Sequence, residues 1–159
     1  MTNGRTVSWH QAEPANLVLI SGPESYFASR ASRLIKDKLR ASHEDLEVNE
    51  VADGEYSPGL IFSLASPSLF NEPRLVIIGS ASEGLAEDLE QLLSEPAENC
   101  TIVVRIPNLV GHNGKLKKQL SASALNVSCE EVNKDVDRID FIKREFQRLE
   151  TPIDQPAIR

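Results

Sequence analysis

Short runs of apolar residues alternate along the chain with longer stretches in which apolar and polar residues are mixed. Three of the runs are continuous in Leu, Val and Ile, which is typical of strands buried on both faces of a parallel sheet. The pattern predicts five strands, at residues 17–21, 46–52, 74–79, 101–106 and 125–129.

Between these runs, apolar residues recur at intervals of three and four, as on a helix that buries one face. Ser57 and Pro58 are typical of an N-cap and first helical residue, because a serine side chain can accept a hydrogen bond from the first turn and proline fits at its start. The predicted helices lie at residues 25–40, 58–64, 84–94, 116–120 and 135–149.

Strand and helix thus alternate five times. This order predicts a three-layer α/β domain with a mainly parallel, five-stranded sheet and right-handed crossovers. The segment 151–159, TPIDQPAIR, differs, because Pro152 ends the preceding helix and the apolar residues after it resemble the start of another element. We expect one domain over residues 1–150 and the truncated beginning of a following domain at 151–159.

The composition is that of an ordinary globular domain: 159 residues, of which 40% are hydrophobic and 26% charged. The formal net charge of −7 argues against the broad basic surface that direct binding to nucleic acid requires. The N-terminus lacks the apolar core of a signal peptide, and no apolar run approaches the roughly 20 residues of a membrane span. We expect a cytoplasmic protein that does not bind membranes.

Cysteine and histidine suggest no special chemistry. Cys100 and Cys129 lie in or beside apolar segments, where a free cysteine acts as a small buried hydrophobe, and we expect no disulfide. His10, His43 and His112 are far apart and show no metal-ligand spacing to cysteine or carboxylate. No metal site is predicted.

The turn after the first predicted strand, SGPESYFASRAS, is where an open α/β sheet would bind a ligand. A phosphate-binding P-loop needs G-x-x-x-x-G-K-[ST], in which glycines let the backbone approach phosphate and lysine supplies charge. Counting from Gly22, the second glycine position holds Phe27, the lysine position holds Ala28, and only Ser29 matches. The turn therefore resembles a degenerate P-loop, and we expect no cofactor.

Other catalytic patterns are missing from the sequence as well. The turn has no G-x-G-x-x-G motif, and the first and third predicted strands lead into Ser21 and Gly79 instead of the acidic residues of a phospho-acceptor domain. The strand at 74–79 lacks the Asp-Glu pair with which an ATPase holds magnesium and polarises water. No G-x-S-x-G nucleophile elbow occurs. We predict no intrinsic enzyme activity.

Lys115, Lys117 and Lys118 form the one concentrated group of positive charge. The simplest interpretation is a solvated helix face, and the alternative is a contact with phosphate or with an acidic partner.

The segment SPSLFNEPRLVII, residues 66–78, places Leu69 and Phe70 in a polar, proline-flanked loop before a buried strand. Two interpretations are open. The pair folds onto the sheet edge beside Leu75 as a lid on the core, or it projects as an anchor for a partner's pocket, with Pro67 stiffening the approach. Burial of both side chains would contribute about 3 to 6 kcal/mol, enough to dominate a modest interface.

Four segments in this order resemble the N-terminal domain of the delta subunit of the bacterial DNA polymerase III clamp loader. They are LVLISGPESYFASRASRLIK, ASPSLFNEPRLVII, CTIVVRIPNLVGHNGKLKKQL and DRIDFIKREF, and the resemblance covers residues 17–149. Its most specific element is Ser68-Leu69-Phe70 before the apolar strand that begins with Arg74. The resemblance implies an AAA+-like nucleotide-binding core without a functional P-loop, which agrees with the degenerate turn.

The resemblance also implies a mechanical role. The family's Leu-Phe pair, here Leu69 and Phe70 after Ser68, inserts into the hydrophobic pocket of the β sliding clamp, and the domain helps to open the ring for loading onto DNA. Pro67 completes the expected contact set, although the family's best-known form has a methionine there. Later domains would contact the gamma or tau and delta prime subunits, and DNA would be contacted only indirectly.

Such a subunit belongs to the DNA polymerase III holoenzyme, whose nucleotidyltransferase activity these residues could not perform. The alternative hypothesis is a P-loop-type NTPase with a degenerate nucleotide site. Magnesium-dependent nucleotide binding would distinguish it from the clamp-binding role.

Overall fold

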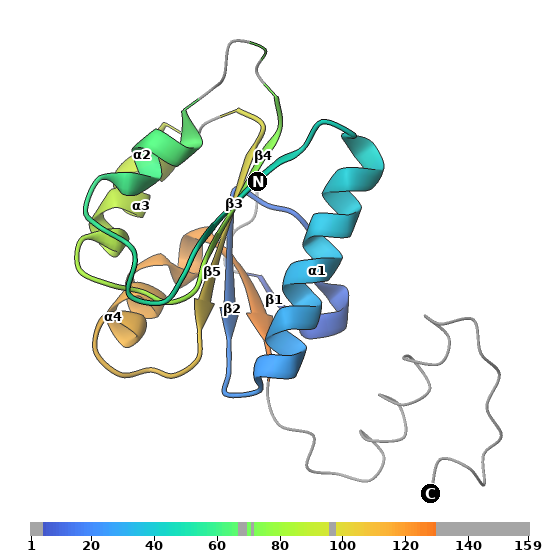
Figure 1. The fold of residues 1–159 in the computed structure, drawn as a ribbon. Helices are drawn as coiled ribbons and strands as arrows, with labels where there is room; N and C mark the ends of the chain where they lie inside the picture. The colour runs from blue at the N-terminus through green and yellow to red at the C-terminus, as the bar shows by residue number, and fades with distance from the viewer. Residues whose placement is uncertain (1–4, 67–69, 71, 96–97, 130–159) are drawn as a thin grey trace, which may run out of the picture.

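The structure is a computed structural model that describes residues 5–66, 70, 72–95 and 98–129. Here a six-stranded sheet lies between two layers of helices (Figure 1). All its strand pairs are parallel, in the order β1-β6-β2-β5-β4-β3. The strands are β1 (Thr6–Ser8), β2 (Leu17–Ser21), β3 (Glu47–Val51), β4 (Arg74–Ile78), β5 (Cys100–Ile106) and β6 (Leu125–Ser128).

The helices divide unequally between the two faces of the sheet (Figure 1). One face carries α1 (Ser25–Ser42) and the short 3-10 helix η1 (Trp9–Gln11). The other carries α2 (Leu60–Ala65), α3 (Leu85–Ser94) and α4 (His112–Leu120), which is followed by the 3-10 helix η2 (Ser121–Ser123). None of the described helices is long and apolar enough to cross a membrane.

The strand order explains this division. Crossovers between parallel strands are right-handed, so connections that step across the sheet in opposite directions lie on opposite faces. The connection from β2 to β3 steps toward the β3 edge, whereas the later connections to β4, β5 and β6 all step back. The connection from β1 to β2, which carries η1, steps in the same direction as the one that carries α1, so these two helices share a face. The predicted three-layer α/β class is confirmed.

Alternate residues of the central strands enter two separate cores. In β2, Leu17 and Leu19 join the core beneath α2, α3 and α4, whereas Val18 and Ile20 join the core beneath α1. In β5, every residue except Arg105 is buried. Burial on both faces is the reason why these strands read as continuous apolar runs in the sequence.

All five predicted strands are present, and the sheet has one strand more than predicted. The additional strand, β1, has three residues, too few for a local pattern, and it forms because β6 offers it an edge, with Val7 opposite Val127. The predicted helices at 25–40, 84–94 and 116–120 are confirmed as α1, α3 and α4. The predicted helix at 135–149 and the boundary at residue 150 lie outside the described residues.

Because the strands all point the same way, the sheet has two chemically different ends. The turn between β2 and α1 lies at the carboxyl end, at the bottom of Figure 1. The connection from α2 to β4, residues 66–73, lies at the amino end, at the top of that view. The two segments that the sequence singled out are thus on opposite sides of the molecule.

The predicted role of Ser57 as an N-cap and of Pro58 as the first residue of α2 is wrong. The helix begins at Leu60 with Gly59 as its N-cap, and Gly59 has φ 88° and ψ −12°, the values of the third residue of a type II turn. The Leu60 N–H donates to the Ser57 carbonyl at 3.0 Å and closes that turn. Pro-Gly is the sequence signal for such a turn, and here it precedes the helix instead of starting it.

The amides at the start of α2 are bonded from outside the helix. The Asp88 carboxylate on α3 accepts hydrogen bonds from the Gly59 N–H at 2.7 Å and the Tyr56 hydroxyl at 2.6 Å. The Tyr56 oxygen in turn accepts the Ile61 N–H at 3.4 Å. Burial, and then the hydrogen bond to Asp88, raise the pKa of Tyr56 above its ordinary value. This cluster fixes α2 to α3 and therefore orients the helix that leads into the 66–73 loop.

We expect Tyr56→Phe to lower the free energy of unfolding by about 1 to 2 kcal/mol near neutral pH, because Asp88 and Ile61 lose a partner. The raised pKa means that the folded state favours the neutral phenol. The contribution of the neutral Tyr56 hydroxyl to the free energy of unfolding is complete below pH 10.0, the ordinary pKa of tyrosine. It is lost as the pH rises toward the raised pKa of the folded state. Urea denaturation followed by fluorescence of the single tryptophan, Trp9, measures both effects.

The stability difference between the two proteins should therefore shrink above pH 10.0. A difference that stays constant or widens at alkaline pH would contradict the assigned hydrogen bond.

Candidate functional site

The connection from α2 to β4 presents an apolar ring to solvent. Phe70 is 82% exposed, more than the other exposed large hydrophobic side chains of the described chain, and it belongs to neither core. It therefore does not act as the core lid that one interpretation of the sequence proposed. Pro67, Ser68 and Leu69, the other residues expected at this site, lie outside the described residues.

Both ends of this loop are held by hydrogen bonds. At the end of α2 the Ser66 hydroxyl donates to the Phe62 carbonyl at 2.7 Å. At the start of β4 the Pro73 carbonyl accepts the Glu47 N–H at 2.9 Å, and the Arg74 N–H donates to the Asn99 carbonyl at 2.7 Å. The loop is therefore fixed to the sheet and to α2 on either side of Phe70.

The side chain of Arg74 strengthens this attachment. It is only 2% exposed, which is rare for a guanidinium unless its charge is compensated by hydrogen bonds. Its Nη1 donates to the Glu72 carbonyl at 3.4 Å and its Nη2 to the Glu98 carbonyl at 3.2 Å. Arg74 thus ties the loop before β4 to the segment before β5.

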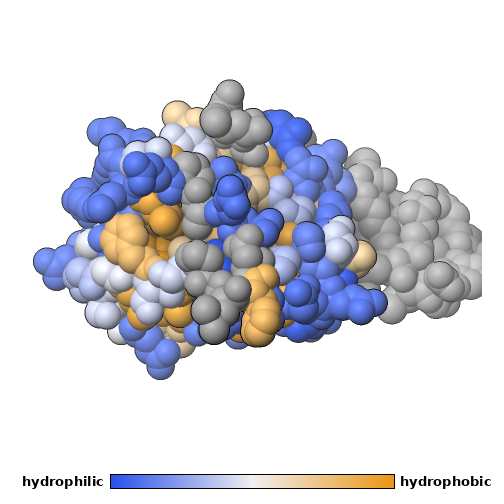
Figure 2. Space-filling view, turned by 90° about the horizontal axis from the view of Figure 1, so that it is seen from above, coloured by the Kyte–Doolittle hydropathy of each residue, from blue (hydrophilic) through white to orange (hydrophobic). Residues whose placement is uncertain are grey.

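Figure 2 looks down on the amino end of the sheet, where this loop lies. Hydrophobic surface is visible in patches beside the grey atoms, and hydrophilic residues form most of the surrounding rim. Apolar surface bordered by polar residues is common at protein–protein interfaces.

The turn at Gly22, at the other end of the sheet, is closed by backbone contacts. The Gly22 N–H donates to the Ile106 carbonyl at 3.1 Å, and the Cys129 N–H donates to the Ser21 carbonyl at 2.8 Å. Gly22 has φ 127°, and a Cβ there would lie 2.2 Å from the Cys129 carbonyl oxygen. The glycine is thus required for close approach of β6, and its amide is occupied instead of facing a phosphate.

The residues at the P-loop positions serve the core. Phe27 and Ala28, in the first turn of α1, are each 5% exposed and pack in the core between this helix and the sheet. The Phe27 ring stacks on Trp9 of η1, with centroids 5.1 Å apart and planes inclined by 3°. Ser29 is exposed on the helix surface. The position where a P-loop has its second glycine, which lets the backbone approach phosphate, is therefore occupied by a bulky aromatic residue.

The three lysines predicted to lie together on α4 have different surroundings. Lys115 and Lys118 are exposed, and Lys115 pairs with Glu87 of α3 at 2.7 Å. This pair lowers the pKa of Glu87 and raises that of Lys115. Both lysines fit the predicted solvated helix face. Lys117 is half-buried instead, and its Nζ lies 3.3 Å from the Ser21 hydroxyl.

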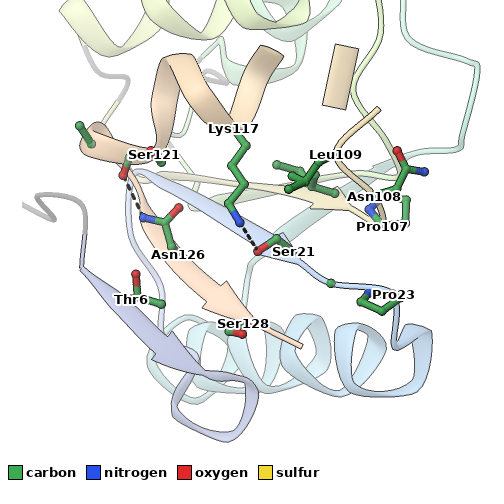
Figure 3. A pocket seen from close by; sticks show the side chains of 13 residues that line it. Thr6, Ser21, Pro23, Pro107, Asn108, Leu109, Lys117, Ser121, Asn126 and Ser128 are labelled. Atoms are coloured by element: carbon green, nitrogen blue, oxygen red, sulfur yellow. Dashed lines mark hydrogen bonds between the residues drawn. The ribbon is translucent and has the colours of Figure 1, made fainter. Parts of the chain in front are cut away.

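Lys117 borders a pocket of about 710 Å³ beside the Gly22 turn (Figure 3). The pocket lies on the α4 side of the sheet, where Thr6, Asn126 and Ser128 form a polar floor. Sequence reasoning missed this site, because its residues come from β1, β2, α4 and β6 and no local motif joins them.

A second exposed apolar pair, Leu109 and Val110, was also missed. These side chains are 64% and 76% exposed in the loop between β5 and α4, at the carboxyl end of the sheet. The Asn108 Oδ1 accepts the Val110 N–H at 3.0 Å and fixes the turn. The sequence signal was present, since two apolar residues stand directly between Pro107-Asn108 and Gly111.

Both cysteines are free and buried, as predicted. Burial raises the pKa of Cys129 to about 11 and also raises that of Cys100, so neither thiol ionises readily at neutral pH. Among the described residues, no group of three or more His, Cys, Asp or Glu side chains could hold a metal ion.

Comparison with known proteins identifies the fold. Neither a protein-family model nor a curated protein matches the sequence. The structure is similar to the DNA clamp loader delta protein of Bacillus subtilis, with a TM-score of 0.59 and 20% identity over 91% of this chain and 47% of that one. The chain thus spans about half the length of that protein. The shared fold confirms the predicted α/β core of the clamp-loader type.

We expect Gly22→Ala to lower the free energy of unfolding by about 2 kcal/mol or more, because the new methyl group would clash with the Cys129 carbonyl and the positive φ would be strained. Gly54→Ala is the matched control, since Gly54 has φ 82° with nothing within 4 Å of the added carbon. It should cost about 1 kcal/mol through backbone strain alone. Equal losses in urea denaturation would show that β6 does not close the turn.

Proposed function

We propose that this chain is the clamp-binding domain of a clamp-loader delta subunit. The observation that carries the proposal is Phe70, whose ring is 82% exposed in a loop held at both ends. The fold shared with a DNA clamp loader delta protein supports the same assignment. Leu69 and Phe70 would insert together into a hydrophobic pocket of the β sliding clamp, with Ser68 and Pro67 leading into the contact.

The energetics suit an anchor of this kind. Exposed phenyl and isobutyl groups contribute about 1.5 to 3 kcal/mol each when a partner buries them. Binding also costs the entropy of ordering the loop, and a loop fixed before binding has less to lose. The hydrogen bonds of Ser66, Pro73 and Arg74 hold the two ends of this loop and would lower the entropy cost of binding there.

Ring opening follows from a difference in affinity. A domain that bound the closed and open rings with equal affinity would not shift the equilibrium between them, however tightly it bound. We infer that this domain prefers a clamp protomer whose shape no longer fits the closed ring. ATP binding by other loader subunits would control when the Leu69–Phe70 surface is presented.

This role requires no chemistry from the chain itself. It would act in the bacterial cytoplasm as a subunit of the DNA polymerase III holoenzyme, touching DNA only indirectly, while other subunits perform nucleotidyl transfer. An NTPase remains the alternative from a different class. Three observations argue against it. The Gly22 amide is already hydrogen-bonded, Phe27 is buried in the core, and Ala28 stands where a P-loop has its lysine.

We expect the double variant Leu69→Ala and Phe70→Ala to lose binding to the β sliding clamp by about 100-fold or more, because about 3 to 6 kcal/mol of apolar transfer energy disappears. Surface plasmon resonance with the immobilised clamp measures the affinity. The melting temperature should stay within about 2 °C, since Phe70 contacts neither core.

The matched control is Leu109→Ala with Val110→Ala, a second exposed apolar pair at the opposite end of the sheet. It should leave clamp affinity within about twofold. A loss of affinity in the control alone, or a Leu69–Phe70 variant that binds normally, would overturn the proposal.

A further inference from the structure

The pocket beside the Gly22 turn has a polar floor for a topological reason. Helix α4 packs over the central strands and places Leu116 in their core, whereas the three-residue η2 contributes Ser121 and Ala122 to the wall of the pocket beside β6. Here Thr6, Asn126 and Ser128 replace the apolar side chains of the central strands (Figure 3). A volume of about 710 Å³ lies within the range of small-molecule sites.

The charge of this pocket is unusual for the chain. The sequence has 24 acidic and 17 basic residues, yet Lys117 is the only charged side chain among the described residues that line the pocket. Its ammonium points toward β2, where the Ser21 hydroxyl is 3.3 Å away (Figure 3). Among the described residues no carboxylate lies within ion-pair distance of it. A half-buried cation without a counter-ion favours the binding of an anion.

A buried acceptor without a donor lies in the same pocket. Asn126 is 7% exposed, and its amide nitrogen donates to the Ser121 and Ala124 carbonyls at 2.9 and 3.3 Å. Its Oδ1 is buried and has no hydrogen-bond partner in the described part of the chain. A buried oxygen in this state is costly, and a donor from a ligand would satisfy it.

We propose that this pocket binds a small phosphorylated molecule that also carries hydroxyl groups. Its phosphate would contact Lys117 and the hydroxyl of Ser21, and a ligand hydroxyl would donate to the Asn126 Oδ1. The site uses neither the Gly22 amide nor the start of α1, so it differs from a P-loop. None of the described residues that line it is a carboxylate, and we expect binding without magnesium. It lies at the opposite end of the sheet from Phe70, so it is independent of the clamp-binding role.

The test is an NMR titration of the ¹⁵N-labelled chain in EDTA, in which amide chemical shifts are followed. The ligands are ribose 5-phosphate, AMP, inorganic phosphate and ribose, each added separately. We expect ribose 5-phosphate and AMP to give saturable shifts at Ser21, Gly22, Lys117 and Ser128, about tenfold tighter than phosphate or ribose alone. Tighter binding of AMP would identify a nucleotide as the source of the phosphate, and tighter binding of ribose 5-phosphate a sugar phosphate.

Lys117→Met should weaken binding by about tenfold or more, whereas Lys117→Arg should retain it because the charge is kept. Lys118→Met is the matched control, since this neighbour on α4 is exposed and does not line the pocket. The free variants' spectra report whether each remains folded. Equal losses in Lys117→Met and Lys118→Met, shifts confined to other surfaces, or no saturable shift at millimolar ligand would overturn the proposal.

Discussion

The parallel direction of all six strands is the constraint on which the rest of the structure depends. It gives the sheet two unlike ends and, through right-handed crossovers, places α1 and η1 on the face opposite α2, α3 and α4. The amino end carries the Phe70 loop, and the carboxyl end carries the Gly22 turn and the Lys117 pocket. The proposed partner site at one end and the proposed small-molecule site at the other are therefore separated by the length of the sheet.

Buried polar groups connect the fold to the proposed interface. Arg74 is enclosed beneath the loop and bonded to two carbonyls, so removing it would leave both segments without donors. At the start of α2, the helix that enters the loop, the Asp88 carboxylate accepts hydrogen bonds from the Tyr56 hydroxyl and the Gly59 N–H and so ties α2 to α3. An exposed aromatic ring serves better as an anchor when its loop is attached to the rest of the domain, and these groups hold the two ends of that connection.

The sequence predicted the elements whose residues follow a local periodic pattern. It did not predict the features that form through contacts between residues distant in the chain. The strand at 74–79 was found because its apolar run is continuous, and the loss of the P-loop was visible in Phe27 and Ala28. The edge strand at Thr6–Ser8 exists only because β6 pairs with it. The cap of α2 was misplaced because its carboxylate, Asp88, comes from another helix. The Lys117 pocket was missed for the same reason.

Hydrogen–deuterium exchange of this chain with and without the β sliding clamp tests the central claim most directly. Amides bonded at an interface exchange more slowly, and the method reports where along the chain this happens. The proposed function predicts slower exchange around Phe70, with no change in the loop that carries Leu109 and Val110. Protection confined to the carboxyl end of the sheet, or no protection at a clamp concentration that saturates binding, would contradict it.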